Sequence, residues 1–173
     1  MPWPILKPLL NKPKKTITKN NMQTLNLTSI KKEVTVAASQ QTAFEVFTQK
    51  MDLWWPRTHH IGSSDMTEVV VEPHVNGRWY TKHIDGSEAP VGYVLRYEPY
   101  DLFVLAWQIN GDFKCDPNLI TEVVVEFIAE GPKTTLVKFE HKDLHKLGNG
   151  KAVESMDGGW GTMLELYKKQ VEQ

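Results

Sequence analysis

Alternating hydrophobic and polar residues run through the middle of the chain, between Glu33 and Asp143. Residues 31–37 alternate with period two, which predicts a strand with one buried face. Six further strand candidates follow, at residues 67–72, 78–84, 92–98, 102–109, 120–128 and 134–141. The turn signals between them are Asn76-Gly77, Asp85-Gly86, Asn110-Gly111 and Gly131-Pro132. Short strands joined by tight turns predict an antiparallel meander.

A second pattern, with the three- and four-residue spacing of a helix, occupies the end of the chain. Its apolar residues are Met156, Trp160, Met163, Leu164, Tyr167 and Val171. Gly158, Gly159 and Gly161 lie in the first two turns, where each costs about 1 kcal/mol relative to alanine. We expect either another backbone close to these glycines or a loop that delivers the chain to the helix. The segment 156–171 is thus predicted to be a long amphipathic helix with small residues at its entry.

A shorter helix follows the first strand. Ser39 is its candidate N-cap, and residues 43–51 have an amphipathic pattern. Trp54-Trp55-Pro56 ends it, since a proline disfavours helix in the residue before it. Because one regular element cannot bury two adjacent residues on one face, we expect Trp54 or Trp55 to face a cavity, a mouth or a partner.

The order of elements predicts an α+β architecture: one strand, a helical insertion, six strands and a long helix. A sheet with one apolar face must be covered, and the C-terminal helix is the available cover. We therefore expect a helix-grip fold, a curved antiparallel sheet wrapped around a long C-terminal helix. Such curling leaves a cavity wherever side chains do not fill the space.

Length and charge limit the possible functions. The 173 residues predict one domain with a real core, and no run is long and apolar enough for a membrane span. Seven of the 20 basic residues precede Glu33, where no acid occurs, so the other 13 accompany 21 acids. An acidic body argues against nucleic-acid binding. The lone Cys115 excludes an intramolecular disulfide and fits a reducing, cytoplasmic location.

The N-terminal segment differs from the rest of the chain. It is basic, lacks acids and contains Pro2, Pro4, Pro8 and Pro13. No apolar core of a secretory signal is present. We expect residues 1–28 to be a disordered, basic, proline-rich leader, with a targeting segment as the alternative, and residues 29–173 to form the domain.

The order of several short motifs resembles a known family. They are Val34-Thr35-Val36, Ala43-Phe44-Glu45-Val46-Phe47, Trp54-Trp55-Pro56, Asn76-Gly77-Arg78-Trp79, Gly92-Tyr93-Val94-Leu95, residues 102–107, Thr134-Thr135-Leu136-Val137, Glu140-His141-Lys142-Asp143-Leu144 and Gly158-Gly159-Trp160. Over residues 30–172 the chain resembles the START-like, or SRPBCC, superfamily. Within it, the chain is similar to the bacterial family related to the C-terminal domain of the activator of the heat-shock-protein-ninety ATPase. The resemblance does not include the activator's N-terminal chaperone-contacting domain, so we do not expect chaperone contact.

The resemblance implies a START-like domain that binds a small hydrophobic molecule between sheet and helix. Aromatic side chains offer rigid apolar walls with polar tips, although they can equally fill a core. The candidate lining residues are Trp54, Trp55, Trp79, Tyr93, Trp107, His141, Trp160 and Leu164. His141 could act as a general base at the end of its strand, or it could be a satisfied core histidine.

No catalytic or metal motif stands out. Paired His59-His60, or His141 with His145, could suggest a metal, but no cysteine partner or HExxH pattern supports one. We expect no metal, no cofactor and no membrane contact, and a homodimer is compatible with the sequence. Binding without defined catalysis is the leading hypothesis. The alternatives are a cyclase, dehydratase or hydrolase that uses the same cavity, and a stress-linked chaperone regulator.

Overall fold

The computed structural model describes residues 28–173. The predicted leader, residues 1–28, lies outside the described residues except for Thr28. The strands are β1 (Ile30–Val36), β2 (Met66–Val71), β3 (Arg78–His83), β4 (Glu88–Glu98), β5 (Leu102–Trp107), β6 (Thr121–Gly131) and β7 (Thr134–His141). The helices are α1 (Gln40–Gln49), the short 3-10 helices η1 (Met51–Leu53) and η2 (Leu144–Leu147), and α2 (Gly150–Val171).

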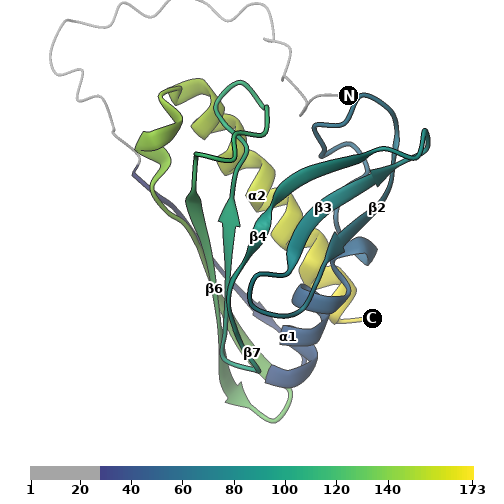
Figure 1. The fold of residues 1–173 in the computed structure, drawn as a ribbon. Helices are drawn as coiled ribbons and strands as arrows, with labels where there is room; N and C mark the ends of the chain where they lie inside the picture. Colours follow the sequence, from purple (N-terminus) through teal and green to yellow (C-terminus); the bar gives the residue numbers. More distant parts are fainter. Residues whose placement is uncertain (1–27) are drawn as a thin grey trace, which may run out of the picture.

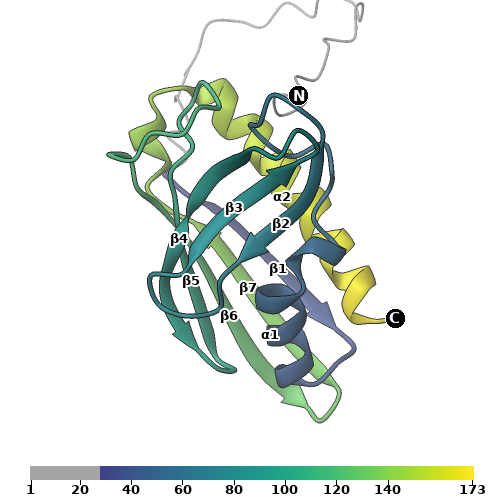
Figure 2. The same cartoon turned by 45° about the vertical axis from the view of Figure 1, so that its right-hand side comes forward.

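All seven strands form one antiparallel sheet in the order β1-β7-β6-β5-β4-β3-β2. Only β1 leaves sequence order, because it pairs with β7 after the meander is complete. The sheet curls around α2, and α1 lies beside α2 on the same concave face (Figure 1, Figure 2). The predicted helix-grip fold is confirmed.

Period-two alternation places the core on this concave face. In register, Phe103 of β5, Val125 of β6 and Phe139 of β7 stand side by side and are all buried. A hydrogen bond joins the two helices: the Tyr167 hydroxyl of α2 donates to the backbone oxygen of Ala43 of α1 at 2.8 Å. Burial raises the pKa of Tyr167, so this hydroxyl keeps its proton.

The helical insertion follows the predicted pattern at its start. The backbone N–H of Thr42 donates to Ser39 Oγ at 3.2 Å, which confirms the N-cap. At its end, Trp54 and Trp55 are both 4% exposed, so neither lies at an open mouth. Both residues lie in the turn that follows η1, and this irregular backbone lets two adjacent side chains reach the same core.

The C-terminal helix begins earlier than predicted. Its first residue is Gly150, and Asn149 caps it by accepting hydrogen bonds from the N–H groups of Lys151 and Ala152. The glycines therefore lie in the middle of α2. A Cβ at Gly158 would meet nothing within 4 Å. The prediction of an entering loop is wrong, because all three glycines lie inside α2. A Cβ at Gly158 or Gly161 would meet no other backbone within 4 Å, so a close backbone does not explain these two glycines.

Replacing a helical glycine that has open space beside it should stabilise the protein. We expect Gly158→Ala to raise the free energy of unfolding by about 0.5–1 kcal/mol, because alanine loses less backbone entropy on folding. Urea denaturation of both proteins measures the change.

Gly77→Ala is the matched control. A Cβ at Gly77 would meet the backbone oxygens of Glu72 and His74 at the β2–β3 turn, so this substitution should be destabilising. Destabilisation by Gly158→Ala would mean that other atoms occupy the space beside Gly158 in solution.

Candidate functional site

Five of the candidate residues are tryptophans that come from separate parts of the chain. Trp54 and Trp55 follow η1, Trp79 lies on β3, Trp107 ends β5, and Trp160 lies on α2. All five are at most 4% exposed. The fold thus brings together side chains that are up to 106 positions apart in the sequence.

Four of these rings form a closed circuit of edge contacts. The centroid distances are 5.7 Å for Trp55–Trp79, 5.6 Å for Trp79–Trp107, 5.7 Å for Trp107–Trp160 and 5.9 Å for Trp160–Trp55. We call these four residues the tryptophan circuit. Edge-to-face pairs at such distances add roughly 0.5–1.5 kcal/mol each beyond the burial of their area. The circuit joins α2 to the β3–β5 part of the sheet.

Gly92 of β4 makes room for the circuit within the sheet. It is paired with Trp79 on one side and with Trp107 on the other. A Cβ at this position would collide with the backbone oxygen of Ala106. The strand can therefore bend closely against β5 only with glycine here, and the two flanking indoles meet across it.

The indole N–H groups of this cluster differ in their partners. Those of Trp54, Trp55 and Trp107 donate to the backbone oxygens of Val46, His59 and Ile109, at 3.0, 2.8 and 2.9 Å respectively. Among the described residues, Trp79 Nε1 is one of the few buried side-chain polar atoms without a hydrogen-bond partner.

His141 is held in a continuous polar chain at the edge of the circuit. Trp160 Nε1 donates to His141 Nδ1 at 3.1 Å, so the neutral ring carries its proton on Nε2, which faces Thr121 Oγ1 at 2.8 Å. Burial lowers the pKa of His141 to about 3. Both ring nitrogens are occupied and the ring resists protonation. This geometry is that of a satisfied core histidine.

The remaining two candidates lie in different places. Leu164 is buried one helical turn after Trp160. Tyr93 is half-buried and is paired with Arg78 and Ala106, each adjacent to a member of the circuit. Since successive residues of a strand point to opposite faces, Tyr93 lies on the convex face. The structure thus separates Tyr93 from the other candidates.

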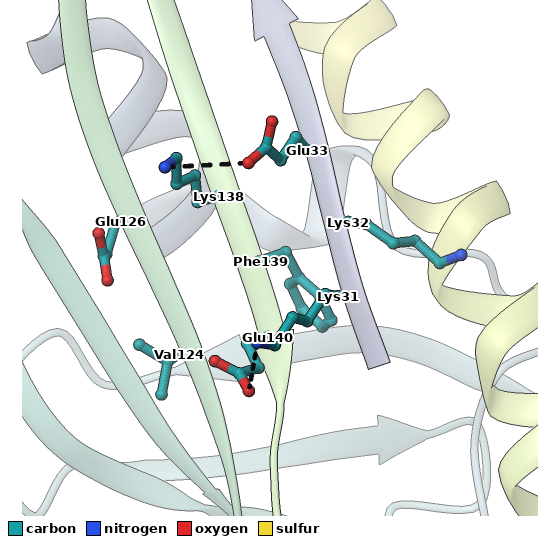
Figure 3. A pocket seen from close by; sticks show the side chains of 8 residues that line it. All are labelled: Lys31, Lys32, Glu33, Val124, Glu126, Lys138, Phe139 and Glu140. Carbon is teal, nitrogen blue, oxygen red and sulfur yellow. Dashed lines mark ion pairs between the residues drawn. The ribbon is translucent and has the colours of Figure 1, made fainter. Parts of the chain in front are cut away.

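Two surface hollows lie outside the tryptophan circuit. The outer-face hollow, of about 240 Å³, is shown in Figure 3 and is lined by Lys31, Lys32, Glu33, Val124, Glu126, Lys138, Phe139 and Glu140. Four of its charged residues pair with one another, Lys31 with Glu140 at 3.8 Å and Lys138 with Glu33 at 3.9 Å. Lys32 instead pairs with Asp157 of α2 at 3.1 Å. A second hollow of about 410 Å³ lies at the start of α1, beside Gln40 and Asp101. Neither contains a candidate residue.

Sequence reasoning missed a buried polar group under the loop between η1 and β2. The His60 and His83 rings meet at a centroid distance of 5.0 Å, and both are at most 5% exposed. His83 Nδ1 donates to the backbone oxygen of Ser64 at 2.7 Å, and its Nε2 faces Thr81 Oγ1 at 2.8 Å. His60 Nδ1 has no partner. Burial lowers the pKa of His60.

Two further expectations concern metals and membranes. Within residues 28–173, no three His, Cys, Asp or Glu side chains are grouped so that they could hold a metal ion. In the same part of the chain, no helix has the length and apolarity that crossing a membrane requires.

Comparison with known proteins identifies the superfamily. No protein-family model matches the chain, and no curated protein matches it. Among solved structures, the anthrahydroquino-γ-pyrone synthase Txn09, complexed with SUM, is 31% identical, with a TM-score of 0.57. That match covers 80% of this chain and 96% of Txn09. CalC from Micromonospora echinospora, a self-sacrificing resistance protein, is 32% identical, with a TM-score of 0.61. It is matched over 83% of this chain and 93% of CalC.

A third solved structure is related at the level of the fold. It is the Aha1 dimer from Colwellia psychrerythraea, which is 16% identical over 83% of this chain and 96% of that protein, with a TM-score of 0.60. A homodimer of the present chain stays a prediction. The helix-grip fold and the two matches above 30% identity lead to one conclusion: the chain belongs to the START-like, or SRPBCC, superfamily.

Proposed function

We propose that this protein binds a small, planar, apolar or amphipathic molecule between its sheet and α2. The observation that carries the proposal is the tryptophan circuit, because four large rigid rings, from the turn after η1 and from β3, β5 and α2, converge on one place. A core that only needs volume can be filled with aliphatic side chains. Flat aromatic rings additionally offer faces against which a planar ligand stacks.

One of the two relatives above 30% identity, Txn09, supports this choice of ligand. Txn09 is named as a synthase of an anthrahydroquino-γ-pyrone, and its structure contains a bound molecule. We infer a ligand of similar shape for this chain, with fused flat rings. The chemical identity of the natural ligand is a separate question from the shape of the site.

The circuit is closed in the structure, so a ligand must separate its rings. The part of α2 that carries Trp160 is suited to this movement. A Cβ added at Gly158 would meet nothing within 4 Å, and one added at Gly161 would meet the end of the Lys32 side chain, 3.8 Å away. A helix deforms most readily where glycines lack supporting contacts. We propose that Trp160 moves with this segment when the ligand enters.

Isothermal titration with anthracene-2-sulfonate tests the proposal, since this probe is planar, amphipathic and soluble. We expect saturable binding of one probe per chain. Trp107→Leu should weaken binding by roughly 2- to 10-fold, because stacking on one aromatic ring contributes about 0.5–1.5 kcal/mol. The melting temperature of each variant must be recorded, since a loosened core also exposes apolar surface.

Lys138→Ala is the control for binding at the outer-face hollow, where a lysine could attract the sulfonate. The proposal expects this variant to bind the probe like the natural protein. Loss of binding in Lys138→Ala together with unchanged binding in Trp107→Leu would place the probe on the convex face and contradict the proposal.

A second candidate function is catalysis in the same interior, and the match to the synthase Txn09 favours it. The two functions differ in the fate of the bound molecule. Mass spectrometry of the small molecule that co-purifies with the protein, before and after incubation with fresh protein, separates them. An unchanged mass supports binding alone, and a new mass supports catalysis.

A further inference from the structure

The donor of Trp79 is the exception in the aromatic cluster. The N–H groups of Trp54, Trp55 and Trp107 reach backbone oxygens, and that of Trp160 reaches a ring nitrogen. Trp79 is 0% exposed, and its Nε1 has no partner. An indole nitrogen can only donate, and a buried donor that gives up water without a replacement is unfavourable. A partner supplied by a ligand would remove this defect.

A second unsatisfied atom lies beside His83, four residues along β3 from Trp79. Trp79, Thr81 and His83 alternate along β3 and are all buried, so they share the concave face. His60, whose Nδ1 also lacks a partner, packs its ring against His83. The under-satisfied polar atoms therefore follow the inner face of β3 and the loop above it.

On the opposite side of the circuit, the hydrogen-bonding atoms of His141 already have partners. There His141 uses both ring nitrogens, on Trp160 and Thr121. Among the described tryptophans of the circuit, the donor without a partner is that of Trp79, on the β3 side. The chemistry that matches a free N–H is an oxygen acceptor such as a carbonyl.

We propose that the indole N–H of Trp79 selects ligands that carry a carbonyl oxygen, so that the natural ligand is a quinone-like planar aromatic molecule. This inference rests on the proposed function, because it requires binding between sheet and helix. Trp79 is a specificity-determining residue here: its N–H donates one hydrogen bond to the ligand and its ring forms one wall.

A matched pair of probes tests the inference. Anthraquinone-2-sulfonate and anthracene-2-sulfonate share the fused-ring outline and the charge, and only the first carries carbonyl groups. We expect the quinone to bind about 3- to 10-fold more tightly, which corresponds to one neutral hydrogen bond. In Trp79→Phe the ratio of the two dissociation constants should fall to about 1.

Trp107→Phe is the matched control, since it removes the same indole atoms from a ring whose N–H already has a partner. It should keep the preference for the quinone. If Trp79→Phe does not fold, the Trp79 indole N–H signal of the natural protein provides a second readout by NMR. This signal should move downfield with anthraquinone-2-sulfonate and much less with anthracene-2-sulfonate.

The outcomes separate the two proposals. If neither probe binds, the proposed function fails, and this inference fails with it. If both bind equally to the natural protein, or if Trp79→Phe retains the preference, ligand binding stands and the role of Trp79 is overturned.

Discussion

Replacing Trp160 with alanine is expected to lower the free energy of unfolding by about 3–5 kcal/mol. The ring is 1% exposed and contacts Trp55, Trp107 and Phe139, so the substitution would leave a large cavity between α2 and the sheet. It would also leave His141 Nδ1 without its donor. Urea denaturation at pH 7 measures the loss.

The control for this substitution lies on the same helix. Leu166 is 37% exposed, so Leu166→Ala should change stability by less than about 1 kcal/mol. A loss of under about 1 kcal/mol for Trp160→Ala as well would place that ring at the surface and contradict the register of α2 described above.

The second large effect is a loss of stability in acid through His141. Its pKa is lowered from 6.5 in the unfolded chain to about 3 in the folded protein. Above pH 6.5 neither state binds the proton. Below it the unfolded state takes up a proton that the folded state refuses, so stability falls as the pH drops from 6.5 towards 3. Between pH 7 and pH 5 we expect a loss of about 2 kcal/mol from this group.

His141→Gln isolates this contribution from that of the other histidines. A glutamine amide can accept from Trp160 and donate to Thr121, as the neutral imidazole does, and it does not titrate. His59 and His60 also have pKa values lowered by burial and remain in both proteins. The free energy of unfolding should therefore decline less in His141→Gln, by about 2 kcal/mol over this pH range. Equal declines in both proteins would show that folding does not lower the pKa of His141.

The strands and the meander of β2 to β7 could be predicted because their signals are local. The pairing of β1 with β7 joins distant parts of the chain and has no local signal. Alternation and turn residues such as Asn76-Gly77 locate β1 to β7 to within a few residues. The start of α2 could not be predicted in the same way. Glycines 158, 159 and 161 resemble a helix entry by propensity, whereas the cap at Asn149 lies two turns earlier. Tertiary packing of the residues around the glycines overrides their low propensity.

The candidate site was predictable in part. The bulky aromatic residues of the sequence identified the members of the tryptophan circuit. Gly92 is paired with Trp79 and Trp107, so strand alternation places its neighbour Tyr93 on the opposite face of the sheet and excludes it from the site. The contact of His60 with His83 could not have been found, since it depends on how the loop after η1 folds over β3. The unpaired N–H of Trp79 is likewise a property of the packed structure and has no signal in the sequence.

The position of a bound probe tests the central claim most directly. Leu164 lies in the core on α2 and Val124 lines the outer-face hollow, so their methyl groups report on opposite faces of the sheet. With a methyl-labelled sample saturated with anthracene-2-sulfonate, intermolecular NOEs should connect the probe to Leu164 and leave Val124 without any. NOEs to Val124 in the absence of any to Leu164 would contradict a ligand site between sheet and helix.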